Sequence, residues 1–259
     1  MIKIVLFDID GTLIRTGGAG VKAFERTSEL VFGIPEGTRH LQFAGRTDSG
    51  LVSEFLQHHG LPDLPENRER FLDSYTHLLD YLLPHCPGAL CPGVDTWLAE
   101  LQALDRDVTV GLLTGNTRLG AEIKLRHYGL WGGFKLGAFG CDHPSRNRLA
   151  EIALARASQQ LGREVHGSEI LVIGDTPLDI ECARAIQAPC LAVATGNFTR
   201  DQLAQHHPTL LLEQLDHMPA QAALQACAAQ VSQITKASKP RRKTKPSLPP
   251  PALGTIQIP

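Results

Sequence analysis

The sequence predicts an α/β fold: a three-layer, Rossmann-like core built on a parallel sheet, with an α-helical cap inserted into it. Three observations predict this fold. Short apolar runs alternate with stretches of helical periodicity, which is typical of a parallel sheet covered by helices on both faces. A long helical stretch, residues 16–86, separates the first apolar run from the second. Three of the apolar runs end in acidic or hydroxyl side chains.

The first apolar run, Ile4–Phe7, predicts a strand that is buried on both faces. It leads directly into Asp8, Asp10 and Gly11. Buried strands do not normally end in acids, because removing a carboxylate from water is costly unless it is paired, hydrogen-bonded or bound to metal. A simple Asp-Gly turn is the alternative interpretation.

Residues 16–86 predict a helical cap. Apolar residues recur there at helical spacing, for example at Leu51, Val52 and Phe55. A crossover between parallel strands needs only about a dozen residues and one helix, so this longer stretch is expected to be a separate small domain. Thr47 or Asp48 is expected to cap one of the helices.

The remaining core is expected to comprise residues 1–15 and 87–235. Further strands are predicted at residues 108–113, 134–139, 170–173, 190–194 and 209–212. Helices are expected between them, and Thr176 followed by Pro177 is a strong helix start. Residues 236–259 are rich in Lys, Arg, Pro and Ser, a composition that predicts a disordered tail.

Charge and cysteine content narrow the function classes. The net charge is −2, but six of the 25 basic residues and none of the 27 acidic ones lie in residues 217–259. An acidic body with a basic tail argues against a nucleic-acid-binding core. No apolar run approaches the ~20 residues of a membrane span. Met1–Lys3 leads straight into the first strand and no Cys pair has C-x-x-C spacing, so we expect a cytoplasmic protein with free thiols and no signal peptide.

Polar side chains stand where three of the predicted strands end. Because the carboxyl ends of parallel strands meet at one edge of a sheet, we expect these groups to converge. Several carboxylates at one point can stay ionised together around a hard cation, and Mg²⁺ prefers oxygen ligands and often bridges carboxylates to phosphate. The converging side chains are those of Asp8, Asp10, Thr114, Asp175 and Asp179. Backbone N–H groups near Ile9, Asp10, Gly115 and Asn116 are candidate donors to phosphate oxygens.

Three stretches resemble the motifs of the haloacid dehalogenase superfamily of phosphohydrolases. They are Asp8-Ile9-Asp10-Gly11-Thr12, Leu112-Leu113-Thr114-Gly115-Asn116 and Gly174-Asp175-Thr176-Pro177-Leu178-Asp179. Their order and spacing match the family, and the resemblance covers about residues 1–215. The inserted helices resemble the cap of the phosphoglycolate phosphatase and β-phosphoglucomutase branch.

The resemblance implies a role for each acid. Asp8 would be the nucleophile and form an aspartyl-phosphate, and Asp10 would act as general acid and then general base. Mg²⁺ would be held by Asp8, the Asp10 carbonyl and Asp175, with Asp179 supporting that site from one helical turn away. Thr114 would orient the phosphoryl group.

The sequence departs from the family at one basic residue. The family usually places a Lys, often followed by Pro, at the start of the helix before the last motif. Arg146 aligns best with that Lys, and Arg148 is the alternate. Arg supplies the same charge with bidentate geometry. The alternative is a surface arginine near a helix start.

The implied function is a Mg²⁺-dependent phosphatase acting on a small phosphorylated metabolite, with a phosphoglycolate-like acid as the leading substrate. Arg46, in the cap, would bind a carboxylate or second phosphate of the substrate, or would be a solvated loop charge. A phosphomutase and a non-catalytic binding protein on the same scaffold are the alternatives. Dehalogenases and phosphonate-cleaving relatives are disfavoured, because they lack the acid found here as Asp10. The sequence does not indicate an oligomeric state.

Two pairs of adjacent histidines are also present, His58-His59 and His206-His207. Because neighbouring residues point to different faces, we expect both pairs to lie at the surface rather than to bind a metal.

Overall fold

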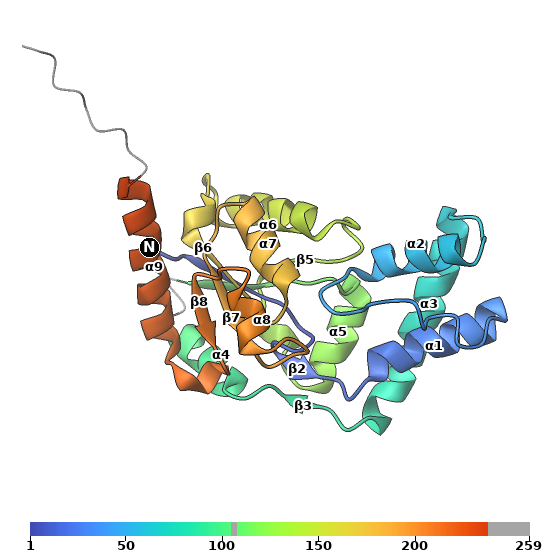
Figure 1. The fold of residues 1–259 in the computed structure, drawn as a ribbon. Helices are drawn as coiled ribbons and strands as arrows, with labels where there is room; N and C mark the ends of the chain where they lie inside the picture. The colour runs from blue at the N-terminus through green and yellow to red at the C-terminus, as the bar shows by residue number, and fades with distance from the viewer. Residues whose placement is uncertain (105–107, 238–259) are drawn as a thin grey trace, which may run out of the picture.

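The computed structural model describes residues 1–104 and 108–237, with side chains described up to residue 230. Its centre is a parallel sheet with the order β5-β4-β1-β6-β7-β8 (Figure 1). The strands are β1 (Ile4–Phe7), β4 (Thr109–Leu113), β5 (Leu136–Ala138), β6 (Ile170–Gly174), β7 (Cys190–Val193) and β8 (Leu210–Leu212). The apolar run at the N-terminus therefore becomes a central strand, paired with β4 on one side and β6 on the other.

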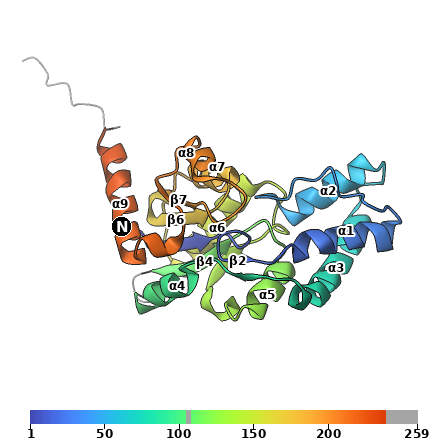
Figure 2. The same ribbon diagram turned by 60° about the horizontal axis from the view of Figure 1, so that its bottom comes forward.

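Helices cover both faces of the sheet. One face packs on α4 (Val94–Ala103), α5 (Arg118–His127) and α9 (Ala220–Ala237). The other packs on α6 (Arg146–Leu161), α7 (Pro177–Ala185) and α8 (Arg200–Ala204). In both ribbon views α7 lies on the opposite side of the sheet from α4 (Figure 2). The predicted three-layer α/β architecture is confirmed.

Three further helices form a group beyond one end of the sheet, on the far side of α5 (Figure 1). They are α1 (Ala19–Phe32), α2 (Asp48–His58) and α3 (Pro65–Leu82). These helices share their own apolar core, in which the rings of Phe24 and Phe55 each lie 5.0 Å from that of Phe71. The predicted helical insertion is confirmed, whereas the boundaries at residues 16 and 86 stay a prediction.

A small antiparallel ribbon, which the sequence analysis did not predict, lies where the chain leaves and re-enters the core. It pairs β2 (Ile14–Arg15) with β3 (Ala89–Leu90). Short 3₁₀ turns complete the structure: η1 (Leu83–His85), η2 (Trp131–Gly133), η3 (Gly167–Glu169) and η4 (Leu215–His217). Each strand of the ribbon is too short to produce a detectable alternation of apolar and polar residues.

Threonine side chains cap the N-termini of the helices nearest the carboxyl edge of the sheet. Thr47 accepts a hydrogen bond from Gly50 N at 3.1 Å and caps α2. Thr117 caps α5, and Thr176, followed by Pro177, caps α7. These caps fix the turns that follow β4 and β6, which is where the polar motifs lie.

Two further expectations concern the ends of the chain and membranes. The predicted disordered tail falls largely on residues 238–259, outside the described residues. Within the described part of the chain, no helix is both long and apolar enough to cross a membrane.

Candidate active site

Three buried carboxylates meet at the carboxyl ends of β1 and β6. One carboxylate oxygen each of Asp8, Asp175 and Asp179 lies within 4.8 Å of those of the other two. Burial raises the pKa of Asp8 to about 6, and the charges of Asp179 and Asp10 act in the same direction. Burial and the neighbouring Asp179 and Asp8 likewise hold the pKa of Asp175 well above its usual range. The protein therefore keeps negative charge concentrated at a point where it is unfavourable unless compensated.

Arg146, the first residue of α6, supplies one compensating charge. Its Nη2 lies 3.1 Å from Asp8 Oδ1 and also pairs with Asp179 Oδ1. Nη1 donates to the carbonyl oxygen of Gly45 at 3.1 Å. Arg148, the alternate, is exposed and pairs with Glu151 on the same helix. Of the two candidate arginines, the structure brings Arg146 to the acids.

The remaining contacts of the acids distinguish Asp179 from the other two. Its Oδ1 pairs with Arg146, while its Oδ2 accepts from the backbone N and the Oγ1 of Thr176 at 3.0 and 2.7 Å. Asp175 Oδ1 accepts from Thr12 Oγ1 at 2.9 Å. Asp179 thus has both oxygens occupied by protein donors, which fits a supporting position behind Asp8 and Asp175.

Asp10 lies beside this group but turns toward α5. Lys124 Nζ lies 2.9 and 2.7 Å from its two carboxylate oxygens, and Asn116 Nδ2 donates to Oδ2 at 2.8 Å. Lys124 also donates to Asn116 Oδ1 at 2.6 Å. Asp8 and Asp10 follow the end of β1 at Phe7, so the alternation of side chains along a strand does not place them on the same face. Asp8 is buried, whereas the Asp10 side chain is 43% exposed.

Two of the predicted phosphate donors, the backbone N–H groups of Ile9 and Asn116, have protein partners in this structure. The Ile9 N–H bonds to the Asp8 carboxylate and lowers its pKa. The backbone N of Asn116 lies 3.3 Å from Thr114 Oγ1, which also accepts from the Asn116 side chain at 2.9 Å. Thr114 is fully buried at the end of β4. The N–H groups of Ile9 and Asn116 thus lie beside the acids, and each bonds to a neighbouring side chain of the protein.

The cap touches the core at the loop after β4. Asp48 N donates to the Gly115 carbonyl oxygen at 2.8 Å, and Thr117 N donates to Asp48 Oδ2 at 2.8 Å. A Cβ on Gly115 would lie 2.0 Å from the carbonyl oxygen of Arg46, so only glycine permits this approach. Burial raises the pKa of Asp48 to about 6, against the opposing effect of Lys124.

The core and cap together enclose a cavity of about 450 Å³ above the acids. Core residues that line it include Asp8, Asp10, Asn116, Lys124 and Asp175, and cap residues include Val21, Phe24, Arg46 and Tyr75. The Arg46 side chain is 38% exposed, and its Nη2 pairs with Glu54 Oε2 at 2.6 Å. Arg46 and the acids therefore line the same cavity.

Comparison of the sequence with known proteins finds a family of hydrolases and several phosphatases. Residues 5–193 match the family described as haloacid dehalogenase-like hydrolase. The chain belongs to this family. Its sequence is 30% identical to a probable phosphatase, IndB, of Dickeya dadantii (strain 3937), over 90% of this chain and 99% of the relative. It is also 28% identical to a phosphoglycolate phosphatase of Synechococcus elongatus, over 82% of this chain and 93% of the relative.

Solved structures share the fold. The crystal structure of CbbY from Rhodobacter sphaeroides in complex with phosphate superposes with a TM-score of 0.68, at 20% identity, over 87% of this chain and all of that chain. A predicted phosphoglycolate phosphatase from Haemophilus somnus gives a TM-score of 0.63 at 18% identity, over 86% of this chain and 96% of that chain. The chain is therefore a haloacid dehalogenase-like phosphatase, and it is similar in sequence to phosphoglycolate phosphatases and in fold to CbbY.

Membership of the haloacid dehalogenase-like family implies a divalent metal, and the buried acids of this chain fit one. Three carboxylates around the single guanidinium of Arg146 leave excess negative charge when all are ionised. The donors are oxygens, which hard divalent cations prefer. The donor set and its charge therefore suit a hard cation between Asp8 and Asp175.

Sequence reasoning missed two members of this site. Lys124 is only 3% exposed and lies beside Ala121 and Leu125 on the buried face of α5. A lysine on the apolar face of a predicted helix was the available signal. Asp48 was considered only as a possible helix cap, and nothing in its local sequence indicates the contact with Thr117.

Proposed function

We propose that this phosphatase is magnesium-dependent and hydrolyses the phosphate monoester of a small, phosphoglycolate-like acid through an aspartyl-phosphate. The observation that carries the proposal is the buried group of Asp8, Asp175 and Asp179 around Arg146, at the base of a cavity shared with the cap. A cavity of about 450 Å³ favours a metabolite over a macromolecular substrate.

Asp8 is the proposed nucleophile. With a pKa of about 6 its carboxyl is mostly ionised near neutral pH, and Arg146 at 3.1 Å stabilises that form. A carboxylate oxygen of Asp8 attacks phosphorus, and the bond between phosphorus and the substrate's bridging oxygen breaks. The products of this step are an aspartyl-phosphate and the free alcohol.

Asp10 is the proposed general acid and base. In the first step a proton passes from its carboxyl to the leaving oxygen. In the second step the same carboxylate takes a proton from the water that attacks phosphorus, so inorganic phosphate leaves and Asp8 is restored. Lys124 and Asn116 contact Asp10 and hold its orientation, and Thr114 is proposed to orient the phosphoryl group.

Asp8, Asp175 and the Asp10 carbonyl are the groups proposed to hold Mg²⁺. Bound there, the ion would neutralise charge on the phosphoryl oxygens. Asp179, with both oxygens held by Arg146 and Thr176, would fix the surroundings of these ligands. Backbone N–H groups of Ile9, Gly115 and Asn116 are proposed to contact the phosphoryl group in the bound state.

Arg46 is proposed to bind the carboxylate of the substrate. It lies on the cap wall of the cavity, and its pairing with Glu54 leaves the side chain more than a third exposed. The likeness to phosphoglycolate phosphatases supports a substrate that carries a carboxylate. A substrate carboxylate would share or replace Glu54 as the partner of Arg46.

The test is phosphate release from a panel of phosphorylated metabolites and p-nitrophenyl phosphate, with Mg²⁺ and with a chelator. We expect Asp8→Asn to abolish turnover while leaving the circular dichroism spectrum unchanged. Asp95→Asn is the matched control, because Asp95 is an exposed acid at the start of α4. Phosphoglycolate should be among the best substrates of the unmodified protein.

Three results would contradict parts of this proposal. Turnover retained by Asp8→Asn would exclude Asp8 as nucleophile. Net isomerisation of a sugar phosphate without phosphate release would indicate a mutase instead. A preference for phosphates without a carboxylate, unchanged in Arg46→Met, would remove the proposed role of Arg46.

A further inference from the structure

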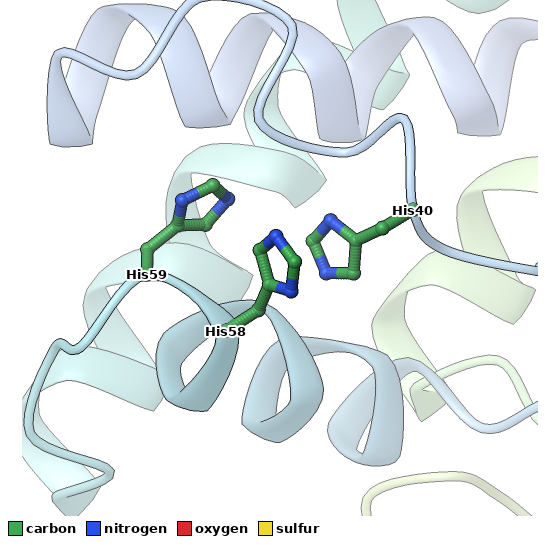
Figure 3. A group of neighbouring side chains, drawn as sticks. All are labelled: His40, His58 and His59. Carbon is green, nitrogen blue, oxygen red and sulfur yellow. The ribbon is translucent and has the colours of Figure 1, made fainter.

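Three histidines meet in the cap, outside the cavity that holds the acids. His40 comes from the loop between α1 and α2, whereas His58 and His59 come from the end of α2 (Figure 3). One ring nitrogen of each lies within 4.8 Å of those of the other two. Adjacent residues are expected to point to different faces, but the ring centroids of His58 and His59 lie only 4.9 Å apart, and His40 joins them from a distant loop.

Two of the three rings are stacked face to face. His40 and His58 are stacked with centroids 3.7 Å apart and an angle of 13° between the rings. Burial, together with the neighbouring His58 and His59, lowers the pKa of His40. Neutral imidazole is the form that binds metals, since protonation removes the free electron pair of the ring nitrogen.

Two of the rings have hydrogen bonding that suits metal ligands. The Nε2 of His40 is buried, and no described residue offers it a hydrogen-bond partner. A buried polar atom without a partner is uncommon in proteins, and coordination of an ion would satisfy this one. The Nε2 of His59 lies 2.7 Å from the Gly37 carbonyl oxygen, to which it donates, so Nδ1 is its basic nitrogen. Metal-binding histidines commonly make such a bond from their second nitrogen to a carbonyl.

We propose that His40, His58 and His59 bind a divalent metal of the zinc class, with water completing the coordination. Three imidazoles suit Zn²⁺, Ni²⁺ or Cu²⁺, whereas Mg²⁺ prefers the oxygen donors of Asp8 and Asp175. Because stacked rings direct their lone pairs in parallel planes, at least one ring turns about its Cβ–Cγ bond on binding. That torsion is soft, and the exposed His58 is free to make the turn.

The probe is Zn²⁺ added to the metal-free, full-length protein in the presence of excess Mg²⁺, followed by equilibrium dialysis and calorimetry. We expect one Zn²⁺ per chain that Mg²⁺ does not displace. His40→Ala and His58→Ala should each weaken this binding by about tenfold or more, because loss of even an outer-shell partner of a metal-binding histidine costs about 10–100-fold. His58→Ala tests the site with little risk to folding, because its side chain is exposed.

Two matched variants separate this site from others. His206→Ala removes one histidine of the second adjacent pair and should leave Zn²⁺ binding unchanged. Asp175→Asn alters the carboxylate group and should still leave one bound Zn²⁺. Displacement of all Zn²⁺ by Mg²⁺, or equal binding by the folded His40→Ala and His58→Ala variants and the unmodified protein, would overturn the proposal.

Discussion

At the scale of single residues, burial of the Asp48 carboxylate makes the free energy of unfolding depend on pH. It is the first residue of α2, and it holds the loop after β4 through Thr117 N at 2.8 Å. Burial raises its pKa from 3.8 to about 6, so the folded protein retains a proton over a range where the unfolded chain has lost it. Ionised Asp48 therefore opposes folding increasingly as pH rises through that range, and the cost is constant above it.

We expect Asp48→Asn to stabilise the protein in a pH-dependent manner. An asparagine oxygen can still accept from Thr117 N, but it carries no charge to desolvate. The gain in the free energy of unfolding should be about 1–3 kcal/mol near pH 8 and should vanish near pH 4. Urea denaturation at both pH values, with a chelator present, measures it. The same difference at both values would show that the charge of Asp48 is not responsible.

At the scale of elements, the site depends on how closely the cap loop approaches the turn after β4. That approach depends on Gly115, at which a Cβ would lie 2.0 Å from the Arg46 carbonyl oxygen and 3.1 Å from the Thr47 Cα. Both are backbone atoms, so no side-chain rotation relieves the contact. A methyl group at Gly115 would therefore push the cap loop away from the core.

We expect Gly115→Ala to lower kcat/KM by about 10–100-fold, because a displacement of about 1 Å in an enzyme site can cost that much. Gly132→Ala is the matched control, since no neighbouring atom lies within 4 Å of a Cβ there. Steady-state kinetics on the best substrate of the panel compares the two variants. Equal kinetics in both would mean that the cap loop does not have to lie this close during turnover.

The elements also show what sequence alone can predict. The strands β1, β4 and β6 and the polar residues that end them were predicted, because buried parallel strands read as continuous apolar runs. The ribbon of β2 and β3 was not, because two residues carry no periodicity. Two contacts could not be predicted, that of Lys124 with Asp10 and that of His40 with His58, because they depend on distances between segments far apart in the chain. Periodicity does not encode such distances.

At the scale of the whole molecule, we propose that residues 1–15 and 87–235 form the catalytic core and residues 16–86 the cap. The core places several acids around one point, where their mutual repulsion works against folding unless a cation is present. Arg146 compensates part of that charge, and burial together with Asp179 and Asp8 keeps the pKa of Asp175 well above its usual range. The carboxylates that the proposed catalytic site requires therefore lower the stability of the metal-free fold.

Repulsion among these acids predicts two effects of Asp175→Asn. The metal-free protein should become more stable, and its stabilisation by Mg²⁺ should become smaller. In chelator the variant should unfold at a higher temperature than the unmodified protein, because one buried carboxylate has lost its charge while its oxygen still accepts from Thr12. Mg²⁺ at about 100 times its dissociation constant should stabilise the unmodified protein by about 2.7 kcal/mol and the variant by much less. Thermal unfolding with Mg²⁺ and with chelator measures both effects, and Asp95→Asn should keep the full response. If Asp175→Asn retained the stabilisation by Mg²⁺, the ion would not bind at Asp175. If the variant were less stable than the unmodified protein in chelator, repulsion among these acids would not limit the stability of the metal-free fold.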